Sequence, residues 1–398
     1  MQFIKPDINI NFMGRRNLFL MISGVLMLLS LLPILVMGLN YGIDFAGGIL
    51  AQVKFKQPVQ AEQIRAALPA ALSDAVVQSF GAEEDNEFLI RSQGRDFSLD
   101  TAGAAIQESL NNAFGEGNAD MRRVETVGPK AGKDLREKAL MAIFFSILLM
   151  GIYISGRFES KWVLSCLMAI VLGLTAFVMN LVLVAMGVSE DIALVVMIIV
   201  VMAVTFLVCI FLRLRYATGA VVSIVHDALL TVGIYCLLGR EFNLTTVAAL
   251  LTIIGFSVND TIIIYDRIRE NLRKGVRKSF VEVINQSINQ TLSRTILTSG
   301  TLLIVVVILF FFGGGVIEDF ALTMIIGVVV ATYSSIYIAS PLLLLVPESR
   351  KKAATSAAKP VRRAKNEDSA LESDSDESAG EAAKKVRKRR VNNRSRRR

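Results

Sequence analysis

The sequence predicts a polytopic α-helical membrane protein of about eight transmembrane helices, with one α+β domain of ferredoxin-like type outside the bilayer. Of the 398 residues, 53% are hydrophobic, and the mean hydropathy is positive. Proteins with several membrane spans have this composition, whereas soluble domains do not. A single long polar segment, residues 40–135, separates the first apolar run from all the others. We therefore expect one helical bundle and one folded domain.

Eight apolar runs are long enough to cross a bilayer, because a transmembrane helix needs about 20 apolar residues. They lie at about 17–39, 137–155, 162–187, 192–213, 217–239, 244–265, 293–313 and 320–346. No small-residue cleavage site follows the first run, so it is expected to remain as a span and not to be removed as a signal peptide.

The distribution of basic residues predicts the orientation of these spans. Lysine and arginine concentrate in every second connection, and basic loops normally stay in the cytoplasm. The basic connections are residues 1–16, 156–161, 213–216 and 266–292. Eight spans with both termini cytoplasmic fit this pattern. Residues 40–135 would then lie on the translocated side of the membrane, and residues 136–347 would complete the bundle.

The polar segment 40–135 has the pattern of a small α+β domain. Helical and alternating apolar periodicities predict two helices and four strands. In chain order these are strand 49–55, helix 61–72, strand 75–80, strand 87–92, helix 99–114 and strand 120–127. This order is the ferredoxin-like split βαβ arrangement. Such a domain could grip an extended chain or a partner along a sheet edge, or it could serve only as a rigid spacer.

Two further segments are expected in the cytoplasm. Residues 266–292 are amphipathic and are predicted to lie on the membrane surface. Residues 348–398 lack aromatic side chains and are predicted to form a disordered tail. The last part of this tail, Lys384 to Arg398, carries ten basic residues and no acid. It could contact anionic lipid or the RNA of a ribosome, or it could be a solvated tail that only reinforces orientation.

Several classes of function are not expected from this sequence. The three cysteines, Cys166, Cys209 and Cys236, fall in apolar spans and form no disulfide framework. His226 is the only histidine, so neither a metal site nor another cofactor is expected. The sequence contains no Walker-type phosphate loop, zinc-protease motif or nucleophile elbow. We therefore do not expect an enzyme that hydrolyses ATP or peptides.

Asp260 is the main candidate functional residue, because it lies within the apolar run 244–265. A charged side chain inside a span costs roughly 2.5–3.5 kcal/mol on insertion scales, and such residues usually face a bundle interior or water. Asn259 and Thr261 flank it, and neighbours on a helix point about 100° apart, so the polar surface covers a wide arc. Asp260 could bind and release protons, or it could form a permanent ion pair with Arg294.

Three other residues are candidates for the same proton pathway. Arg294, near the start of the run 293–313, would stay charged and act as a fixed counter-ion, or it could extend to the membrane surface. His226 and Asp227 interrupt the run 217–239. They could extend a relay, since imidazole titrates near neutrality, or they could be a polar contact between packed helices.

Glycines at the end of the first span predict a special backbone conformation. Gly42, Gly47 and Gly48 flank Asp44 where the chain leaves the membrane. Glycine permits sharp turns and close backbone approach. These residues could form a hinge between domain and bundle that transmits proton-linked motion, or only a tight turn.

A weak internal repeat surrounds the third and fourth spans. The string ISGRF, Ile154 to Phe158, is similar to LRLRY, Leu212 to Tyr216, at an offset of 58 residues. At this offset Met168 and Ala169 replace His226 and Asp227. The hairpin 137–187 could therefore be a depolarised copy of 192–239, although chance similarity between apolar hairpins is an alternative.

Six sequence strings, in this order along the chain, resemble the SecD/SecF family of protein-export membrane proteins. The resemblance is to the SecF-type members of this family, which belongs to the resistance-nodulation-division superfamily. The strings are YGIDFAGG (Tyr41 to Gly48), VGP (Val127 to Pro129), IVHDALLTVG (Ile224 to Gly233), EFNLTTVAALLTIIGFSVNDTIIIYDRIREN (Glu241 to Asn271), INQTLSRTILTSG (Ile288 to Gly300) and TYSSIYIASPLLL (Thr332 to Leu344). The resemblance covers about residues 1–155 and 213–347.

The resemblance implies a six-span bundle that pairs with SecD beside the SecY–SecE–SecG channel. Such a pair uses the proton gradient to promote late steps in the export of unfolded polypeptides. It also implies proton passage at the positions of Asp260 and Arg294. A YidC-type insertase is a further candidate partner. Two alternatives are a scaffold that holds translocon and insertase together without transport, and an exporter of lipids or small molecules.

The sequence departs from the family pattern at residues 157–214. Family members run from an RF-type turn directly into the span that contains the HD pair, whereas this chain has two extra spans in between. An even number of spans preserves the orientation of everything downstream. The insertion leaves open how its neighbours pack and whether they contact SecD.

Overall fold

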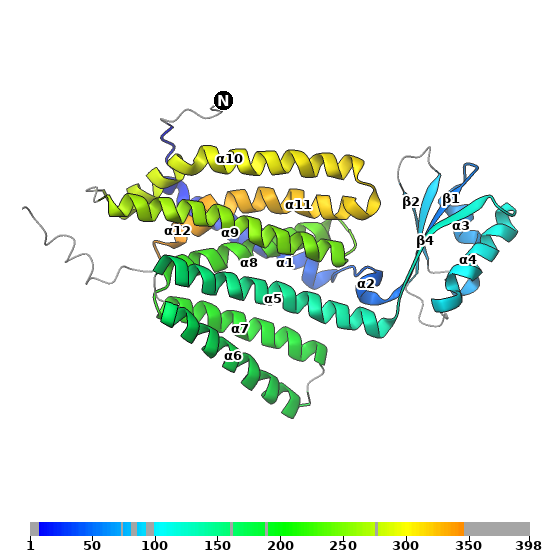
Figure 1. Cartoon of the computed structure of the whole chain (residues 1–398), viewed down its shortest axis with the longest axis horizontal. Helices are drawn as coiled ribbons and strands as arrows, with labels where there is room; N and C mark the ends of the chain where they lie inside the picture. Colours follow the sequence, from blue (N-terminus) through cyan, green and yellow to red (C-terminus); the bar gives the residue numbers. More distant parts are fainter. Residues whose placement is uncertain are drawn as a thin grey trace, which may run out of the picture. The chain divides into compact units, whose positions relative to one another are not determined.

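The predicted spans form long helices in a computed structural model that describes residues 8–72, 75–80, 86–92, 99–159, 162–187, 190–274 and 278–345. Eight helices make up the bundle (Figure 1). They are α1 (Arg16–Val36), α5 (Pro129–Glu159), α6 (Trp162–Ala185), α7 (Glu190–Phe211), α8 (Arg215–Leu237), α9 (Leu244–Arg273), α10 (Phe280–Phe312) and α11 (Gly315–Ser334). A π-helical turn, Ser335–Ala339, and the short helix α12 (Ser340–Leu342) extend α11.

Within the described residues, seven helices are long and apolar enough to cross a membrane. The eighth expected span is α7, a helix of 22 residues that is apolar from Ile192 onward. The expected helical bundle is therefore confirmed.

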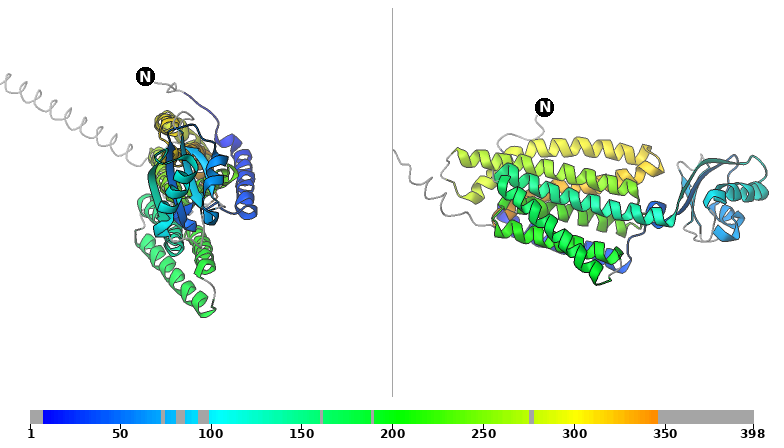
Figure 2. Two further views of the ribbon diagram at one scale, coloured as in Figure 1. Left: turned by 90° about the vertical axis from the view of Figure 1, so that its right-hand side faces the viewer. Right: turned by 60° about the horizontal axis from the view of Figure 1, so that its bottom comes forward.

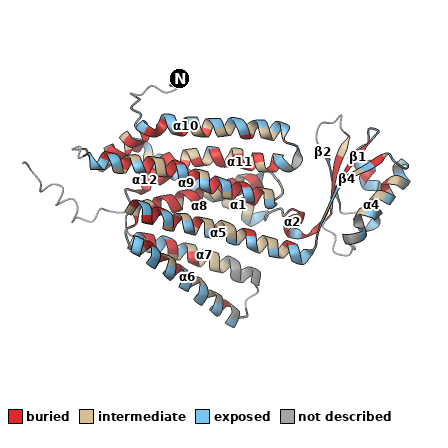
Figure 3. Cartoon of the chain, in the orientation of Figure 1, coloured by how far each residue is buried: buried red, intermediate tan, exposed pale blue. Residues whose placement is uncertain are grey.

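The bundle has a buried centre and an apolar periphery. More than half of the apolar window is buried in α8, α9 and α11, compared with 17% in α1 and α10. Figure 3 shows this difference as continuous buried faces on the central helices. The exposed side chains of the outer helices are mostly apolar, as lipid contact requires. Polar groups in the centre are thus shielded from lipid by surrounding helices.

The segment between α1 and α5 folds into the expected α+β domain. The strands are β1 (Gly48–Phe55), β2 (Val76–Phe80), β3 (Glu87–Ser92) and β4 (Ala119–Val127), and the helices are α2 (Ile43–Ala46), α3 (Ala61–Ala67) and α4 (Leu99–Phe114). The strand order β2-β3-β1-β4, with antiparallel neighbours, is ferredoxin-like. Alternate residues of β1 pack under α3 and α4 in one apolar core.

The helix expected over residues 61–72 is divided in the structure. It ends at Ala67, Leu68 is extended, and a separate 3-10 turn spans Ala70–Leu72. Pro69 explains the break, because proline disfavours helical geometry at the residue before it.

The segment 266–292, expected to be amphipathic and to lie on the membrane surface, is divided between two helices. Its position at the membrane surface stays a prediction. Residues up to Arg273 continue α9, and α10 begins at Phe280 behind a capping box formed by Ser279 and Glu282. Ile268, Val283, Ile284 and Ile288 of the segment are buried in one apolar cluster with Phe12 and Met13 of the N-terminal residues, whereas Leu272 is exposed. Asn289 of α10 accepts a hydrogen bond from the Ile10 amide at 2.8 Å, which fixes this N-terminal segment. The predicted tail, 348–398, lies outside the described residues.

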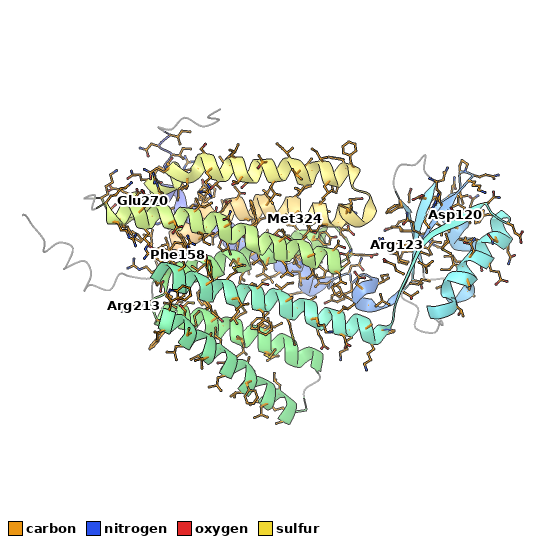
Figure 4. The ribbon with its side chains drawn as sticks, viewed as in Figure 1. Asp120, Arg123, Phe158, Arg213, Glu270 and Met324 are labelled. Atoms are coloured by element: carbon orange, nitrogen blue, oxygen red, sulfur yellow. The ribbon has the colours of Figure 1, made fainter. Side chains whose placement is uncertain are left out.

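The extra helices α6 and α7 pack as a pair against α5 and α8 at one margin of the bundle (Figures 1 and 2). Their apolar contact includes Phe144, Met168 and Leu172. The end of α5 and the start of α8 nevertheless meet directly. The rings of Phe158 and Tyr216 are 5.3 Å apart, and the Tyr216 amide donates to Glu159 at 3.3 Å. Figure 4 labels Phe158 and Arg213 at this same end. The hairpin is therefore an addition to a continuous core.

Candidate proton-pathway site

The centre of the bundle contains a cluster of buried polar side chains from α8, α9, α10 and α11. On α9, Ser257, Asp260 and Thr261 have helical i, i+3, i+4 spacing and are all buried. On α10, Thr291, Thr295 and Ser299 recur every fourth residue and are also buried. Each helix thus presents one polar stripe to its neighbours, so that the polar groups meet inside the bundle and not at the lipid surface.

Asp227 is held by three neighbouring side chains. Its Oδ2 atom accepts hydrogen bonds from Ser257 at 2.6 Å and from Ser334 at 2.8 Å. Its Oδ1 atom lies 3.0 Å from Nδ1 of His226. The sequence did not require adjacent His226 and Asp227 to interact, but they do. Both oxygens are bonded, and the donors come from three different helices, so Asp227 links α8, α9 and α11.

Asp260 is also fully buried, but it has fewer partners. Ser299 donates to its Oδ2 atom at 3.4 Å, and the hydroxyls of Ser299 and Thr332 are 2.8 Å apart. The Oδ1 atom has no hydrogen-bond partner among the described residues. Buried polar atoms without partners are uncommon in proteins. Nε2 of His226 and Oγ1 of Thr295 likewise have no hydrogen-bond partner among the described residues.

The two carboxyl groups are close along the same helices. Ser257, which bonds Asp227, precedes Asp260 by three residues, about 4.5 Å along the axis of α9. On α11, Ser334 bonds Asp227, while Thr332 bonds the hydroxyl that reaches Asp260. Groups from the surroundings of both acids therefore lie within one turn of each other along α9 and along its neighbour α11.

Arg294 and Asn259 lie outside this buried cluster. Both are exposed, and they line a groove of about 670 Å³ between α5, α9 and α10. In the described part of the chain no direct ion pair joins Arg294 to Asp260, so the alternative of a permanent ion pair is not observed. Nearby, Arg157 pairs with Asp266 at 2.6 Å across the groove. The six predicted pathway residues therefore divide into four buried and two exposed ones.

The predicted hinge residues form the base of the α+β domain. Gly47 has φ 78° and Gly48 has φ 140°, conformations that favour glycine. A Cβ atom on Gly47 would lie 2.9 Å from Cα of Pro129 on α5. Asp44 lies on α2, and its Oδ2 atom accepts a hydrogen bond from the Leu244 amide at 3.0 Å. Gly42 bonds Phe242 through its backbone at 2.9 Å. The structure therefore requires glycine at position 47 and places Asp44 against α9.

Sequence reasoning missed Ser257, Ser334 and Thr332 as members of the site. Ser257 could have been found, because it lies one helical turn before Asp260 on the same face. Ser334 and Thr332 lie in the string TYSSIYIASP, whose polar residues are unusual in a span, but nothing in the sequence indicates which helix they face. Among the described residues, no three histidine, cysteine or acidic side chains lie close enough to bind a metal ion together.

Comparisons with known proteins agree with this architecture. A family model described as "Protein export membrane protein SecD/SecF, C-terminal" matches residues 106–199 and 188–349, and one described as "SecD/SecF GG Motif" matches residues 34–59. The second match covers the glycines of the hinge, and the first covers all four helices of the buried polar cluster.

Curated relatives and solved structures point to the same family. Protein translocase subunit SecF of Magnetococcus marinus is 39% identical over 274 residues, which cover 68% of this chain and 71% of the relative. The subunit of the same name in Vibrio alginolyticus is 36% identical over 304 residues, covering 76% and 78%. The crystal structure of SecDF, a translocon-associated membrane protein of Thermus thermophilus, has 29% sequence identity and a TM-score of 0.61.

The match to SecDF covers 86% of this chain but only 39% of the longer SecDF chain. The aligned relatives, by contrast, are matched over most of their length. The chain therefore belongs to the SecD/SecF family of protein export membrane proteins, as a SecF-type member.

Proposed function

We propose that this chain uses the proton gradient across a bacterial inner membrane to promote the late steps of protein export. The observation that carries the proposal is Asp260, a fully buried carboxyl group in a membrane helix with one oxygen that has no partner among the described residues. Burying a charged carboxylate is costly, and binding a proton removes that cost. A group in this position responds to proton supply more strongly than a carboxylate whose oxygens are all bonded.

The two buried acids have different roles in this proposal. Asp260 loads and releases the proton, with Ser299 and Thr332 as the adjacent hydroxyls. Asp227 has donors on both oxygens and acts as the fixed polar contact that holds α8, α9 and α11 in register. His226, whose Nε2 atom is unpartnered within the described residues, is a candidate to pass the proton onward.

In this proposal Arg294 influences Asp260 through its charge in the groove and not through a direct ion pair. Its guanidinium stays charged and lies on α10, the helix that also carries Ser299. Asn259, next to Asp260 in sequence, lines the same groove. Water in the groove would reach the outer face of α9 beside Asp260, on the side that we assign to the cytoplasm together with both termini.

The partners follow from the family. SecD would complete the bundle, and the SecY–SecE–SecG channel would supply the translocating unfolded polypeptide; a YidC-type insertase is a further candidate. The periplasmic domain would change position with the protonation of Asp260 and hold the exported chain against backsliding. The basic end of the tail would contact anionic lipid or the ribosome.

A non-transporting scaffold is the second candidate function. The fully bonded Asp227 favours it, because such a contact stabilises helix packing without any proton transfer. A scaffold predicts that neutral substitution of Asp260 leaves gradient-dependent export intact.

The test is protein export from cells or vesicles with and without a proton gradient, comparing the parent protein with Asp260→Asn. Co-purification with SecD confirms that the complex has assembled. Loss of only the gradient-dependent part supports the proposal. Full gradient-dependent export with Asp260→Asn overturns it and favours the scaffold.

A further inference from the structure

The N-terminus of α9 is bound by a side chain from a distant part of the sequence. The first amides of a helix have no partner within it. Asn243, the residue before α9, accepts from the Thr246 amide at 2.9 Å. Asp44, 200 residues earlier in the chain, accepts from the Leu244 amide at 3.0 Å. A carboxylate at this end of a helix is electrostatically favourable, so α9 is capped both by its own residue and by the base of the α+β domain.

Backbone contacts reinforce this connection. The Phe242 amide donates to the Asn40 carbonyl at 2.6 Å, and the Gly42 amide donates to the Phe242 carbonyl at 2.9 Å. Tyr41 and Phe242 form an isolated parallel bridge. The chain before Asp44 is therefore held along the connection that leads into α9, which restricts the position of the Asp44 carboxylate.

The other end of this segment leads directly into the domain. Asp44 belongs to α2, and β1 begins at Gly48. A Cβ atom on Gly132 of α5 would lie 3.0 Å from both the Gly47 amide nitrogen and the Phe45 carbonyl oxygen. There is no room for slippage between α2 and the first turns of α5. Because β4 ends at Val127, just before α5, both chain connections of the domain meet at this place.

We infer that Asp44 is a positioning residue that couples movement of the periplasmic domain to α9, the helix that carries Asp260. The inference rests on the proposed function. A displacement of α2 transmits to the first turn of α9 through the Asp44–Leu244 hydrogen bond. Asp260 lies 16 residues further along this helix, about 24 Å at 1.5 Å per residue. Since α9 is continuous over this length, it carries the displacement to the buried acid.

The experiment compares Asp44→Ala with Asn243→Ala in the full chain, assembled with SecD. Both variants remove one cap from the same helix end, so a merely structural role lowers thermal stability in both. Coupling is measured by hydrogen exchange of residues 40–48, with Asp260 intact and with Asp260→Asn as the neutral form. In the parent protein the exchange rate of residues 40–48 should differ roughly five-fold or more between these two forms, which is the lower end of typical coupling. Asn243→Ala should keep this change and Asp44→Ala should lose it, while Asp44→Asn, which retains an oxygen acceptor, should restore part of it.

Two results overturn the inference. One is an equal response to Asp260→Asn in Asp44→Ala and in the parent; the other is the absence of any response in the parent. Export measurements keep this test separate from the proposed function. If Asp260→Asn abolishes gradient-dependent export while Asp44→Ala retains it in full, the proposed function stands and the role of Asp44 is wrong.

Discussion

Ser257 donates a hydrogen bond to Asp227 from a position one helical turn before Asp260. Ser257 and Asp260 lie on adjacent turns of α9, so the surroundings of Asp227 and of Asp260 are neighbours in the centre of the bundle. One acid is bonded on both oxygens, and the other has an oxygen without a partner among the described residues. We propose that this difference separates the two roles, helix packing at Asp227 and proton exchange at Asp260.

Replacing Ser257 or Ser334 by alanine should destabilise the bundle. Each hydroxyl donates to the same oxygen of buried Asp227, and a hydrogen bond to a charged group contributes roughly 1.5–3 kcal/mol. The double variant should lose more free energy of unfolding than the two single variants together, because it leaves that oxygen of Asp227 without a donor. Equilibrium unfolding in mixed micelles measures the effect. Thr252→Ala is the control, since that exposed hydroxyl bonds only its own helix; strictly additive losses would contradict a shared site.

Gly47→Ala should destabilise the base of the domain by about 1–3 kcal/mol, the usual cost of a backbone conformation that only glycine adopts readily. Gly47 has φ 78°, and an added Cβ atom would lie 2.9 Å from Cα of Pro129. Gly128→Ala is the matched control, because no atom lies within 4 Å of its added Cβ. The measurement is the thermal stability of the purified protein. Equal stability of the two variants would show that the turn at Gly47 is not strained.

Deleting residues 160–214 should preserve folding and assembly with SecD. The end of α5 and the start of α8 already meet through Phe158, Glu159 and Tyr216, so the shortened chain can be rejoined there. Apolar side chains uncovered by the loss of α6 and α7, such as Phe144, can face lipid, whereas the buried Ser155 loses its hydrogen bond from Ser165 of α6. Co-purification and export assays test this expectation. Loss of assembly would show that the hairpin is part of the essential core.

Arg294→Lys should retain most gradient-dependent export, whereas Arg294→Gln should reduce it by roughly five-fold or more, as typical for the loss of one coupling. No direct ion pair joins Arg294 to Asp260 in the described part of the chain, so charge and not guanidinium geometry is expected to matter. Lys278→Gln removes a more distant exposed charge and serves as the control. If the lysine variant fails as completely as the glutamine variant, Arg294 must make a specific contact that charge alone does not explain.

The sequence predicted the fold well, because the bundle and the domain follow from local patterns. Apolar runs of spanning length gave the helices, and the alternation in residues 49–55 and 120–127 gave the central strand β1 and the edge strand β4. Part of the apolar stripe of segment 266–292 packs against other helix ends and the N-terminal residues. Amphipathicity alone does not distinguish a membrane surface from such a protein surface.

The site was predicted only in part. Asp260, Asp227 and His226 were identifiable, since ionisable residues inside spans are rare. The hydroxyls of Ser257 and Ser334 were not, because their function depends on which helices face each other. The exposed position of Arg294 likewise depends on the rotation of α10 about its axis. The sequence pattern does not specify that rotation once a helix has polar residues on more than one face.

The most direct test of the central claim is infrared difference spectroscopy of the SecD-bound protein, recorded between high and low pH. The signal of interest is the carbonyl band of a protonated, buried carboxyl group. We predict a band that disappears in Asp260→Asn but persists in Asp227→Asn and in Asp266→Asn, which alters an exposed ion pair on the same helix. A band that survives Asp260→Asn unchanged, or that disappears only with Asp227→Asn, would contradict the assignment of proton exchange to Asp260.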